Sequence, residues 1–250
     1  MKTLYVIGIG PGRPDQMTLR AARMIRDCDV IVGYPVYTDL LGDLKEGKEL
    51  LTTPMRQEEK RCRMAFEAAS SGRKVVMVCS GDPGVYGMAG LLYEMGEDYP
   101  DVAVEVVSGV TAALSGAAVL GAPLMHDFAV ISLSDLMTPW DLIEKRLAAA
   151  AASDMVICLY NPSSKKRADY LKKACRIVMQ HASEDRVCGL VQKIGREGET
   201  SRILTLAELA DTAVDMFTTV FIGNSETRRI GGRMVTPRGY VLSEKPSKAD

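Results

Sequence analysis

The sequence predicts an α/β protein in which strands and helices alternate through two successive halves. Short apolar, β-branched runs such as Val75-Val76-Met77-Val78 recur along the chain, and several lead through glycine-containing loops into segments of helical periodicity. This alternation favours largely parallel or mixed sheets covered by helices. Strands are expected at 4–9, 30–32, 49–52, 74–78, 102–107, 127–131, 154–159, 186–194, 200–205 and 218–222. Helices are expected at 17–27, 57–71, 86–97, 139–152, 165–181 and 206–211, with a further alanine-rich helix after 108–113.

Gly121-Ala122-Pro123 is the strongest break between the two halves, because glycine and proline interrupt regular structure just before a new apolar run. We therefore expect a first α/β domain at 1–122, and a second at 123–250 that completes the ligand site. A terminal hairpin is expected over 229–242 and a frayed tail over 245–250.

The composition argues against several classes of function. Hydrophobic residues make up 47% and charged residues 25%, and the formal net charge is -1, so no global attraction to nucleic acid or membrane is expected. The uncharged stretch 106–125 is long enough to span a membrane, but its glycines, proline and hydroxyl residues favour a strand, turn and buried helix. Six cysteines without CxxC spacing suit a reducing cytoplasm, and two histidines give little basis for a protein-bound metal.

Cys79–Ala89, with the sequence C-S-G-D-P-G-V-Y-G-M-A, directly follows a predicted buried strand. So many glycines and prolines are more than a simple turn needs, so we expect a ligand-binding loop, with a plain strand-to-helix turn as the alternative. Gly8-Ile9-Gly10-Pro11-Gly12 is a second such loop. It does not match a dinucleotide fingerprint, because Arg13 stands where GxGxxG needs glycine and Pro11 lacks a backbone donor.

The segment Gly33–Asp39 is predicted to be a loop that carries Tyr34, Tyr37 and Asp39. It could line a substrate cleft, or its tyrosines could pack on the surface. The following helix 57–71 is expected to bury Met64, Ala65 and Ala68 and to turn Arg56, Lys60, Arg61 and Arg63 to solvent.

No hydrolase triad, P-loop or zinc-protease motif is present in the sequence. Several backbone-rich loops with few catalytic side chains are typical of an enzyme whose reactivity comes from a bound cofactor, and a group-transfer cofactor fits best.

Motifs in order along nearly the whole chain resemble the tetrapyrrole methylase family. They are Gly8–Gly12 (G-I-G-P-G), Thr18–Ala22 (T-L-R-A-A), Ser80–Gly84 (S-G-D-P-G) and Ser108–Ala112 (S-G-V-T-A). Asp127–Asp135 (D-F-A-V-I-S-L-S-D), followed by Thr138-Pro139-Trp140, and Leu159–Ser163 (L-Y-N-P-S) resemble one branch, the precorrin-3B C(17)-methyltransferases of cobalamin biosynthesis.

The resemblance implies a two-domain class III methyltransferase fold, a cytoplasmic homodimer, and S-adenosylmethionine bound in the cleft between the domains. The implied reaction methylates C-17 of precorrin-3B or its cobalt form, contracts the ring to give the corresponding precorrin-4, and releases S-adenosylhomocysteine. The cofactor contacts implied by similarity are Pro11, Ser80, Gly81, Asp82, Val85, Thr111, Ala112, Asn161 and Ile194.

Methyl transfer from a sulfonium needs alignment and desolvation more than a strong nucleophile, but ring contraction calls for an acid or base. Our candidates are Asp39, Asp135, Ser132, Tyr34 and His126. Asp135 could instead cap a helix, and His126 could be a satisfied loop histidine.

The carboxylates of a tetrapyrrole call for cations, and the unassigned candidates for binding them are Arg13, Arg56, Lys48 and Arg167. Any cobalt is expected in the substrate, with no metal held by the protein.

The sequence leaves three alternatives open. The chain could be another tetrapyrrole methylase, acting at C-20 of precorrin-2, at C-11 of precorrin-4 or on uroporphyrinogen. It could be a ribosomal-RNA methylase of the same fold, which its charge does not favour. It could also be a non-catalytic nucleotide-binding protein with the same glycine loops.

Overall fold

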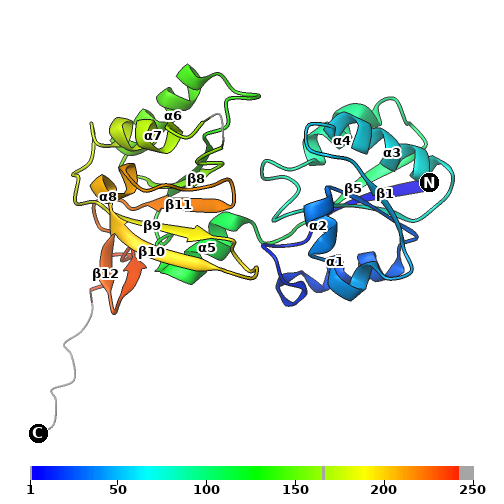
Figure 1. Ribbon diagram of the computed structural model, residues 1–250, viewed down its shortest axis with the longest axis horizontal. Helices are drawn as coiled ribbons and strands as arrows, with labels where there is room; N and C mark the ends of the chain where they lie inside the picture. The colour runs from blue at the N-terminus through cyan, green and yellow to red at the C-terminus, as the bar shows by residue number, and fades with distance from the viewer. Residues whose placement is uncertain (1, 165–166, 242–250) are drawn as a thin grey trace, which may run out of the picture. The chain divides into compact units, whose positions relative to one another are not determined.

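The computed structural model describes residues 2–164 and 167–241, and the chain divides into two compact units (Figure 1). Unit 1 comprises Met1–Ser115 and Lys193–Glu199, and unit 2 comprises Gly116–Gln192 and Thr200–Asp250. The division falls a few residues before the predicted boundary at 122. It also assigns a seven-residue segment from the second half of the chain to unit 1.

Unit 1 contains a five-stranded sheet in which every neighbouring pair is parallel. Its strands are β1 (Lys2–Gly8), β2 (Val30–Gly33), β3 (Glu49–Thr52), β4 (Val75–Cys79) and β5 (Val102–Val107), in the order β3-β2-β4-β1-β5. Its helices are α1 (Leu19–Asp27), α2 (Pro35–Asp39), α3 (Glu58–Ser70) and α4 (Ala89–Gly96), with 3-10 turns η1 (Pro14–Gln16) and η2 (Gly42–Lys45).

Helices cover both faces of this sheet because the strands are apolar on both sides. On one face, Phe66 of α3 and Leu92 of α4 pack against Val6 and Met77. On the other, Ile25 of α1 packs in a second cluster of strand residues, and Figure 1 shows α1 and α2 together on that side. The result is a three-layer unit in which the carboxyl ends of the parallel strands form one edge.

Unit 2 contains a mixed five-stranded sheet. Its strands are β7 (Phe128–Ser132), β8 (Val156–Tyr160), β9 (Val187–Gln192), β10 (Thr200–Thr205) and β11 (Thr218–Ile222), in the order β10-β9-β11-β8-β7. Only β7 and β8 are parallel, so they share a carboxyl edge. The helices are α6 (Trp140–Ala152), α7 (Tyr170–Val178) and α8 (Leu206–Ala210), and a small third sheet joins β6 (Gly121–Ala122), β12 (Arg228–Ile230) and β13 (Arg233–Val235). The helix α5 (Ala112–Leu120) crosses the division between the units.

One face of the unit 2 sheet buries its apolar residues under α6, α7 and α8. Gly189 lies in β9, in the interior of this sheet. A Cβ on Gly189 would lie 3.1 Å from the Met234 sulfur and under 3.0 Å from Leu120, so α5 and β13 approach the sheet closely at this residue. Parallel and mixed sheets with helical layers confirm the predicted α/β fold class.

Several predicted elements are corrected by the structure. Gly33–Asp39 is not simply a loop, because Pro35 starts the short helix α2. The helix expected from Tyr86 begins only at Ala89, since Tyr86 has a left-handed φ of 54°. Strand β9 ends at Gln192, two residues early. The residues 165–166 of one predicted helix, and the tail, lie outside the described residues.

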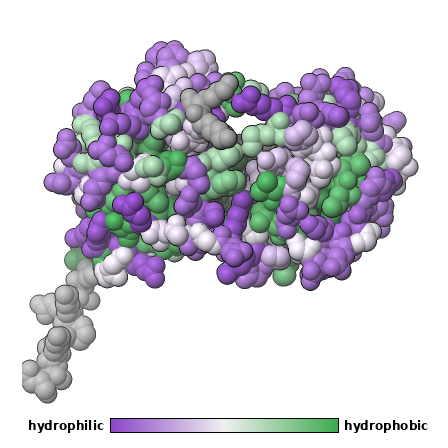
Figure 2. Space-filling model, in the orientation of Figure 1, coloured by the Kyte–Doolittle hydropathy of each residue, from purple (hydrophilic) through white to green (hydrophobic). Residues whose placement is uncertain are grey.

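Thr18, suggested as the cap of the first helix, accepts a 3.1 Å hydrogen bond from the Ala21 N–H. No helix in the described part of the chain has the length and apolarity to cross a membrane. Hydrophilic residues predominate on the face shown in Figure 2, with smaller apolar areas between them.

Candidate functional site

The carboxyl edge of the unit 1 sheet brings together most of the predicted cofactor contacts. Strands β4, β1 and β5 are neighbours, and each leads into one of the small-residue loops. The loop after β1 contains Pro11, the loop after β4 contains Ser80, Gly81 and Asp82, and the loop after β5 leads to Thr111, with Ala112 starting α5. Pro11 lies about 70 positions from Ser80 and about 100 positions from Thr111 in sequence, yet these residues follow adjacent strand ends, as expected for parallel strands.

Glycine is needed here because the three loops touch through their backbones. Gly10 and Gly81 form an isolated bridge, with Gly81 N–H donating to Gly10 O at 2.7 Å and Gly10 N–H to Gly81 O at 3.1 Å. A Cβ on Gly8 or Gly109 would lie less than 3.0 Å from backbone atoms of neighbouring loops. The glycines that we interpreted as room for a ligand therefore serve first to pack the loops on one another.

The Asp82 carboxylate fixes the same arrangement. One oxygen accepts the Gly84 N–H at 2.8 Å within its own loop, and the other accepts the Gly109 N–H at 2.9 Å from the loop after β5. A carboxylate that accepts two backbone donors is a strong connection between segments. Val85, another predicted contact, continues the turn, donating its N–H to Asp82 O at 3.3 Å.

Arg196 joins two of these loops from the segment 193–199. Its Nε donates to Pro11 O at 3.2 Å and its Nη2 to Ser80 Oγ at 3.1 Å. Ile194, the predicted contact in the same segment, is buried. Burial lowers the pKa of the half-buried Arg196 guanidinium, although the nearby Tyr37 acts in the opposite direction.

Arg61 is buried at the same end of unit 1, which corrects its predicted place on a solvated helix face. Only 5% of Arg61 is exposed, and its Nη2 donates to Thr53 O and Pro54 O, both at 3.2 Å. Its guanidinium carbon lies 5.9 Å from the centre of the Tyr34 ring. Tyr37, which packs edge-on against Tyr34, has a pKa raised mainly by burial, so its phenol is protonated at neutral pH.

In unit 2, Ser132 and Asn161 meet at the carboxyl ends of the parallel strands β7 and β8. Asn161 Nδ2 donates to Ser132 Oγ at 3.0 Å, and the Ser134 N–H donates to the same oxygen at 3.2 Å. Asn161 has a left-handed φ of 52°, a conformation that asparagine tolerates better than most residues. The structure therefore brings together one predicted cofactor contact and one catalytic candidate.

Asp135 lies in a polar cluster at the same edge. Its two oxygens accept from Tyr170 OH at 2.7 Å and from Arg167 Nη1 at 3.2 Å, while Arg167 also donates to Ser134 Oγ at 2.6 Å. The hydrogen bond from Tyr170 is the main cause of a lowered pKa of the Asp135 carboxyl. Asp135 is thus an ionised acceptor paired with Arg167, one of our four candidate cations.

The other two catalytic candidates lie apart from these clusters. Asp39 has an exposed side chain at the end of α2 and forms a 3.2 Å ion pair with Lys45. His126 precedes β7, at the opposite end of that strand from Ser132. It lines a separate open pocket of unit 2 with Asp127, Asp154 and Glu226.

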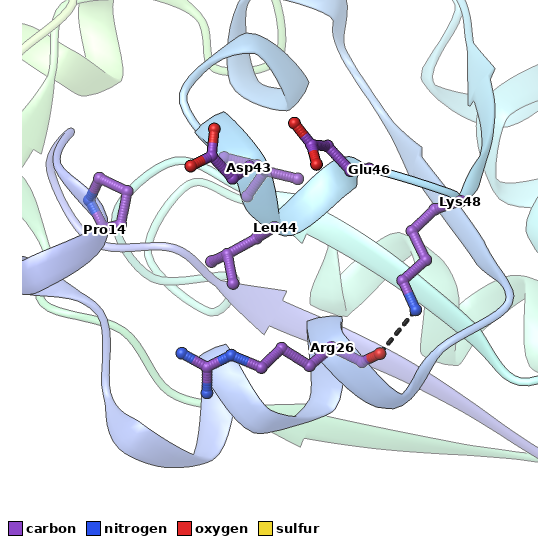
Figure 3. A pocket seen from close by; sticks show the side chains of 7 residues that line it. Pro14, Arg26, Asp43, Leu44, Glu46 and Lys48 are labelled. Carbon is purple, nitrogen blue, oxygen red and sulfur yellow. Dashed lines mark hydrogen bonds between the residues drawn. The ribbon is translucent and has the colours of Figure 1, made fainter.

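Two candidate cations have local partners. Lys48 Nζ donates to Arg26 O at 2.6 Å and Cys28 O at 2.8 Å, so it binds carbonyls at the end of α1 (Figure 3). Arg13 pairs with Asp15, and both are exposed. The pocket of about 560 Å³ that Lys48 lines contains none of the predicted cofactor-binding or catalytic residues, and charged Arg26, Asp43 and Glu46 also line it (Figure 3).

All six cysteines are buried and reduced. Burial raises the pKa of Cys79, which directly precedes Ser80, to about 11. Its thiol is therefore protonated at neutral pH and a poor nucleophile.

The unit 1 edge has the form of a backbone-lined ligand site on an α/β scaffold, and comparison with known proteins gives the family. The profile of the Tetrapyrrole (Corrin/Porphyrin) Methylases matches residues 3–210, so the chain belongs to this family. It is 43% identical over 240 residues to a Salmonella typhimurium protein named probable cobalt-factor III C(17)-methyltransferase, covering 96% of this chain and 100% of the relative. It is 45% identical to the Archaeoglobus fulgidus cobalamin biosynthesis protein CbiHC, covering 95% of this chain but only 52% of that relative.

Solved structures agree with this assignment of family. The methyltransferase CobJ aligns with a TM-score of 0.88 and 36% identity, over 95% of this chain and 100% of CobJ. A cobalt precorrin-4 methyltransferase, CbiF, aligns with a TM-score of 0.76 and 26% identity, over 88% and 94% of the two chains. The predicted tetrapyrrole methylase family is therefore confirmed.

Sequence reasoning missed the contributions of Arg196, Arg61 and Tyr170. Arg196 follows Gly195 and precedes Gly198, and such a glycine pair after a strand was the available signal of a tight, specific turn. Tyr170 follows Asp169 in a charged helix and carries no pattern that indicates its partner.

Proposed function

We propose that the chain is an S-adenosylmethionine-dependent C-methyltransferase of cobalamin biosynthesis. It would methylate C-17 of cobalt-factor III, or of the related precorrin-3B, with contraction of the ring. The observation that carries this proposal is the 43% identity to a relative with that named activity, aligned over the whole of its length. The names of the relatives favour a cobalt-containing substrate, in which the cobalt is part of the substrate.

The donor set at the unit 1 edge fits S-adenosylmethionine. The loops offer backbone groups, the half-buried Ser80 and Thr111, and small side chains, which allow a flat nucleoside to approach closely. The nearby Cys79 is protonated and buried, so no thiolate there competes for an electrophilic methyl group. We propose that Pro11, Ser80, Gly81, Asp82, Val85, Thr111, Ala112, Asn161 and Ile194 hold the cofactor.

When bound, the cofactor supplies an electrophilic methyl group on a sulfonium. The protein's task is to align the acceptor carbon and exclude water, which side chains fixed before binding do at the least entropic cost. Asp82 contributes by fixing two loops through the Gly84 and Gly109 N–H groups.

Ring contraction needs a proton donor or acceptor, and the polar cluster of unit 2 supports two roles. The Ser132 hydroxyl is oriented by Asn161 and by the Ser134 N–H, so it can relay a proton along a fixed direction. Asp135 stays ionised because its pKa is lowered, which suits a proton acceptor or a counter-charge more than an acid. Tyr34, held beside Arg61, remains a third candidate, and the positions of Asp39 and His126 support them less.

Further parts of the proposal are a homodimer, a cytoplasmic location and no nucleic-acid partner.

The second candidate is a cobalt-precorrin-4 methylase, favoured by the structural similarity to CbiF. An assay separates the two. Purified protein is incubated with S-adenosylmethionine and, in parallel, cobalt-factor III, precorrin-3B, precorrin-2, cobalt-precorrin-4, uroporphyrinogen or ribosomal RNA.

We expect one added methyl group and ring contraction with cobalt-factor III or precorrin-3B, detected by mass spectrometry and absorption. Methylation of cobalt-precorrin-4 or of RNA alone would overturn the choice of substrate. Absence of heat on calorimetric titration with S-adenosylhomocysteine would overturn the methyltransferase proposal and leave a different nucleotide or a non-catalytic role.

A further inference from the structure

The segment 193–199 is a hydrogen-bonded turn that leaves β9 and belongs to unit 1. Lys193, Gly195 and Gly198 all have left-handed φ angles, of 53°, 66° and 77°. The turn is closed from within, because the Gly195 N–H donates to Glu199 Oε2 at 2.6 Å and the Arg196 N–H to Lys193 O at 2.9 Å. This geometry presents the Arg196 side chain in a defined direction.

The turn fits closely against the loop after β1. A Cβ on Gly12 would lie less than 3.0 Å from the Gly195 backbone, and a Cβ on Gly195 would lie equally close to Gln16 Oε1. Gln16 Oε1 is itself buried and lacks a hydrogen-bond partner within the described part of the chain. Glycine at 12 is thus explained by the approach of this turn.

Arg196 then connects the two loops that carry predicted cofactor contacts. The planar guanidinium donates from Nε to Pro11 O and from Nη2 to Ser80 Oγ, at 3.2 and 3.1 Å. Two donors of one rigid group fix both acceptors at once, which a lysine ammonium cannot reproduce. The neighbouring Gly10–Gly81 bridge joins the same loops through their backbones.

We propose that Arg196 is a positioning residue for the S-adenosylmethionine site, acting through the Ser80 hydroxyl and the Pro11 carbonyl. The inference rests on the proposed function, since it assumes that these loops bind the cofactor. Its consequence is specific: loss of Arg196 weakens cofactor binding and leaves the chemical step largely intact, because Arg196 donates hydrogen bonds to both of these loops.

The test is calorimetric titration of S-adenosylhomocysteine into the full-length wild type, Arg196→Gln, Arg196→Lys, Ser80→Ala and the Arg196→Gln/Ser80→Ala double variant. Loss of hydrogen bonds from a charged donor predicts a dissociation constant raised at least about tenfold in Arg196→Gln. Arg196→Lys should lie between it and the wild type. The double variant should bind within about twofold of Arg196→Gln, because the two changes remove one shared bond.

Arg202→Gln is the matched control, because Arg202 is an exposed arginine of β10, the strand that follows the same turn. It should bind like the wild type. Steady-state kinetics with the tetrapyrrole substrate add a second readout: in Arg196→Gln the KM for S-adenosylmethionine should rise while kcat at saturating cofactor stays within about twofold.

Wild-type affinity in Arg196→Gln would overturn the inference, as would a fall in kcat with an unchanged KM for the cofactor. If Arg196→Gln does not fold, as judged by circular dichroism, wild-type binding by Arg196→Lys would show a structural role and likewise overturn it. A wild type that binds S-adenosylhomocysteine but methylates no tetrapyrrole would refute the proposed substrate and leave the binding test of Arg196 intact. A wild type that binds none would refute the proposed function itself, and with it the inference.

Discussion

Each unit has one edge where parallel strands end, and different kinds of contact connect the loops at these two edges. At the unit 1 edge, the backbones of Gly8, Gly81 and Gly109 touch, and hydrogen bonds run between main-chain groups. At the unit 2 edge, side chains make the connections: Asn161 binds Ser132, and Asp135 binds Arg167 and Tyr170.

The difference predicts different sensitivities. A backbone-packed edge has no room for an added atom, so it should fail on small steric changes. An edge built from charged and polar side chains should tolerate steric change better and respond to protonation. The first arrangement suits the site of an invariant cofactor, and the second suits groups that exchange protons.

The largest effect should come from adding one methyl group to the unit 1 edge. In Gly109→Ala the new Cβ would meet the Gly81 carbonyl and the Gly8 backbone at less than 3.0 Å, and neither can move aside alone. We expect a loss of about 3 kcal/mol in the free energy of unfolding, at the upper end of the usual range for overpacking. Urea denaturation measures it.

Gly90→Ala is the control, since nothing lies within 4 Å of its added Cβ and the residue is in α4. It should raise stability by roughly 0.5–1 kcal/mol. Equal stability of the two variants would contradict the close packing of the three loops.

A smaller effect, on binding alone, is expected from Ser80→Leu. The leucine removes the acceptor of Arg196 Nη2 and fills space beside the predicted cofactor. S-adenosylhomocysteine affinity should fall at least about tenfold while the fold remains intact. Calorimetry and circular dichroism check the two parts, with Ser201→Leu on the exposed strand β10 as control. Normal affinity in Ser80→Leu would argue against Ser80 as a cofactor contact.

At the unit 2 edge, Ser132→Ala and Asn161→Gly should affect the same step. Glycine accepts the left-handed conformation of Asn161, so this variant removes the amide without adding strain. Each change should lower kcat by roughly twofold to tenfold, as expected for one hydrogen bond, and the double variant should be no worse than the more impaired single variant. Fully additive effects would show that the two side chains act independently.

The smallest effect should be a pH dependence of stability at Asp135. Its folded-state pKa lies below the unfolded value of about 3.9, so the ionised carboxylate stabilises the fold above that pH. The wild type should exceed Asp135→Asn in thermal stability by a constant margin above about pH 5, and the margin should shrink as the pH falls through the folded-state pKa. A margin that does not change down to pH 2 would contradict the ionised pairing.

Most of the fold follows from local patterns in the sequence. The β-branched runs predicted strands such as 102–107 and 218–222 with the bounds that the structure has. The small-residue loops at Ser80 and Ser108 were recognisable because each directly follows such a run, and parallel order brings them together.

The remainder depends on contacts between distant segments. The charge pattern predicted Arg61 on a solvated helix face. In the structure its guanidinium is buried, because it donates hydrogen bonds to the Thr53 and Pro54 carbonyls, which precede the helix in sequence. Arg196 was missed because its role requires 193–199 to lie with unit 1, more than 100 residues away in sequence from the loops that it binds. Tyr170 and Asp135 are 35 residues apart and meet only through the arrangement of β7 and α7.

The most direct test of the central claim is a crystal structure of the full chain with S-adenosylhomocysteine. We expect the ligand at the unit 1 edge, in contact with the loops at Pro11, Ser80–Asp82 and Thr111, with Arg196 still bonded to Ser80. Ligand density at another place, such as the pocket beside Lys48, with these loops untouched, would contradict it.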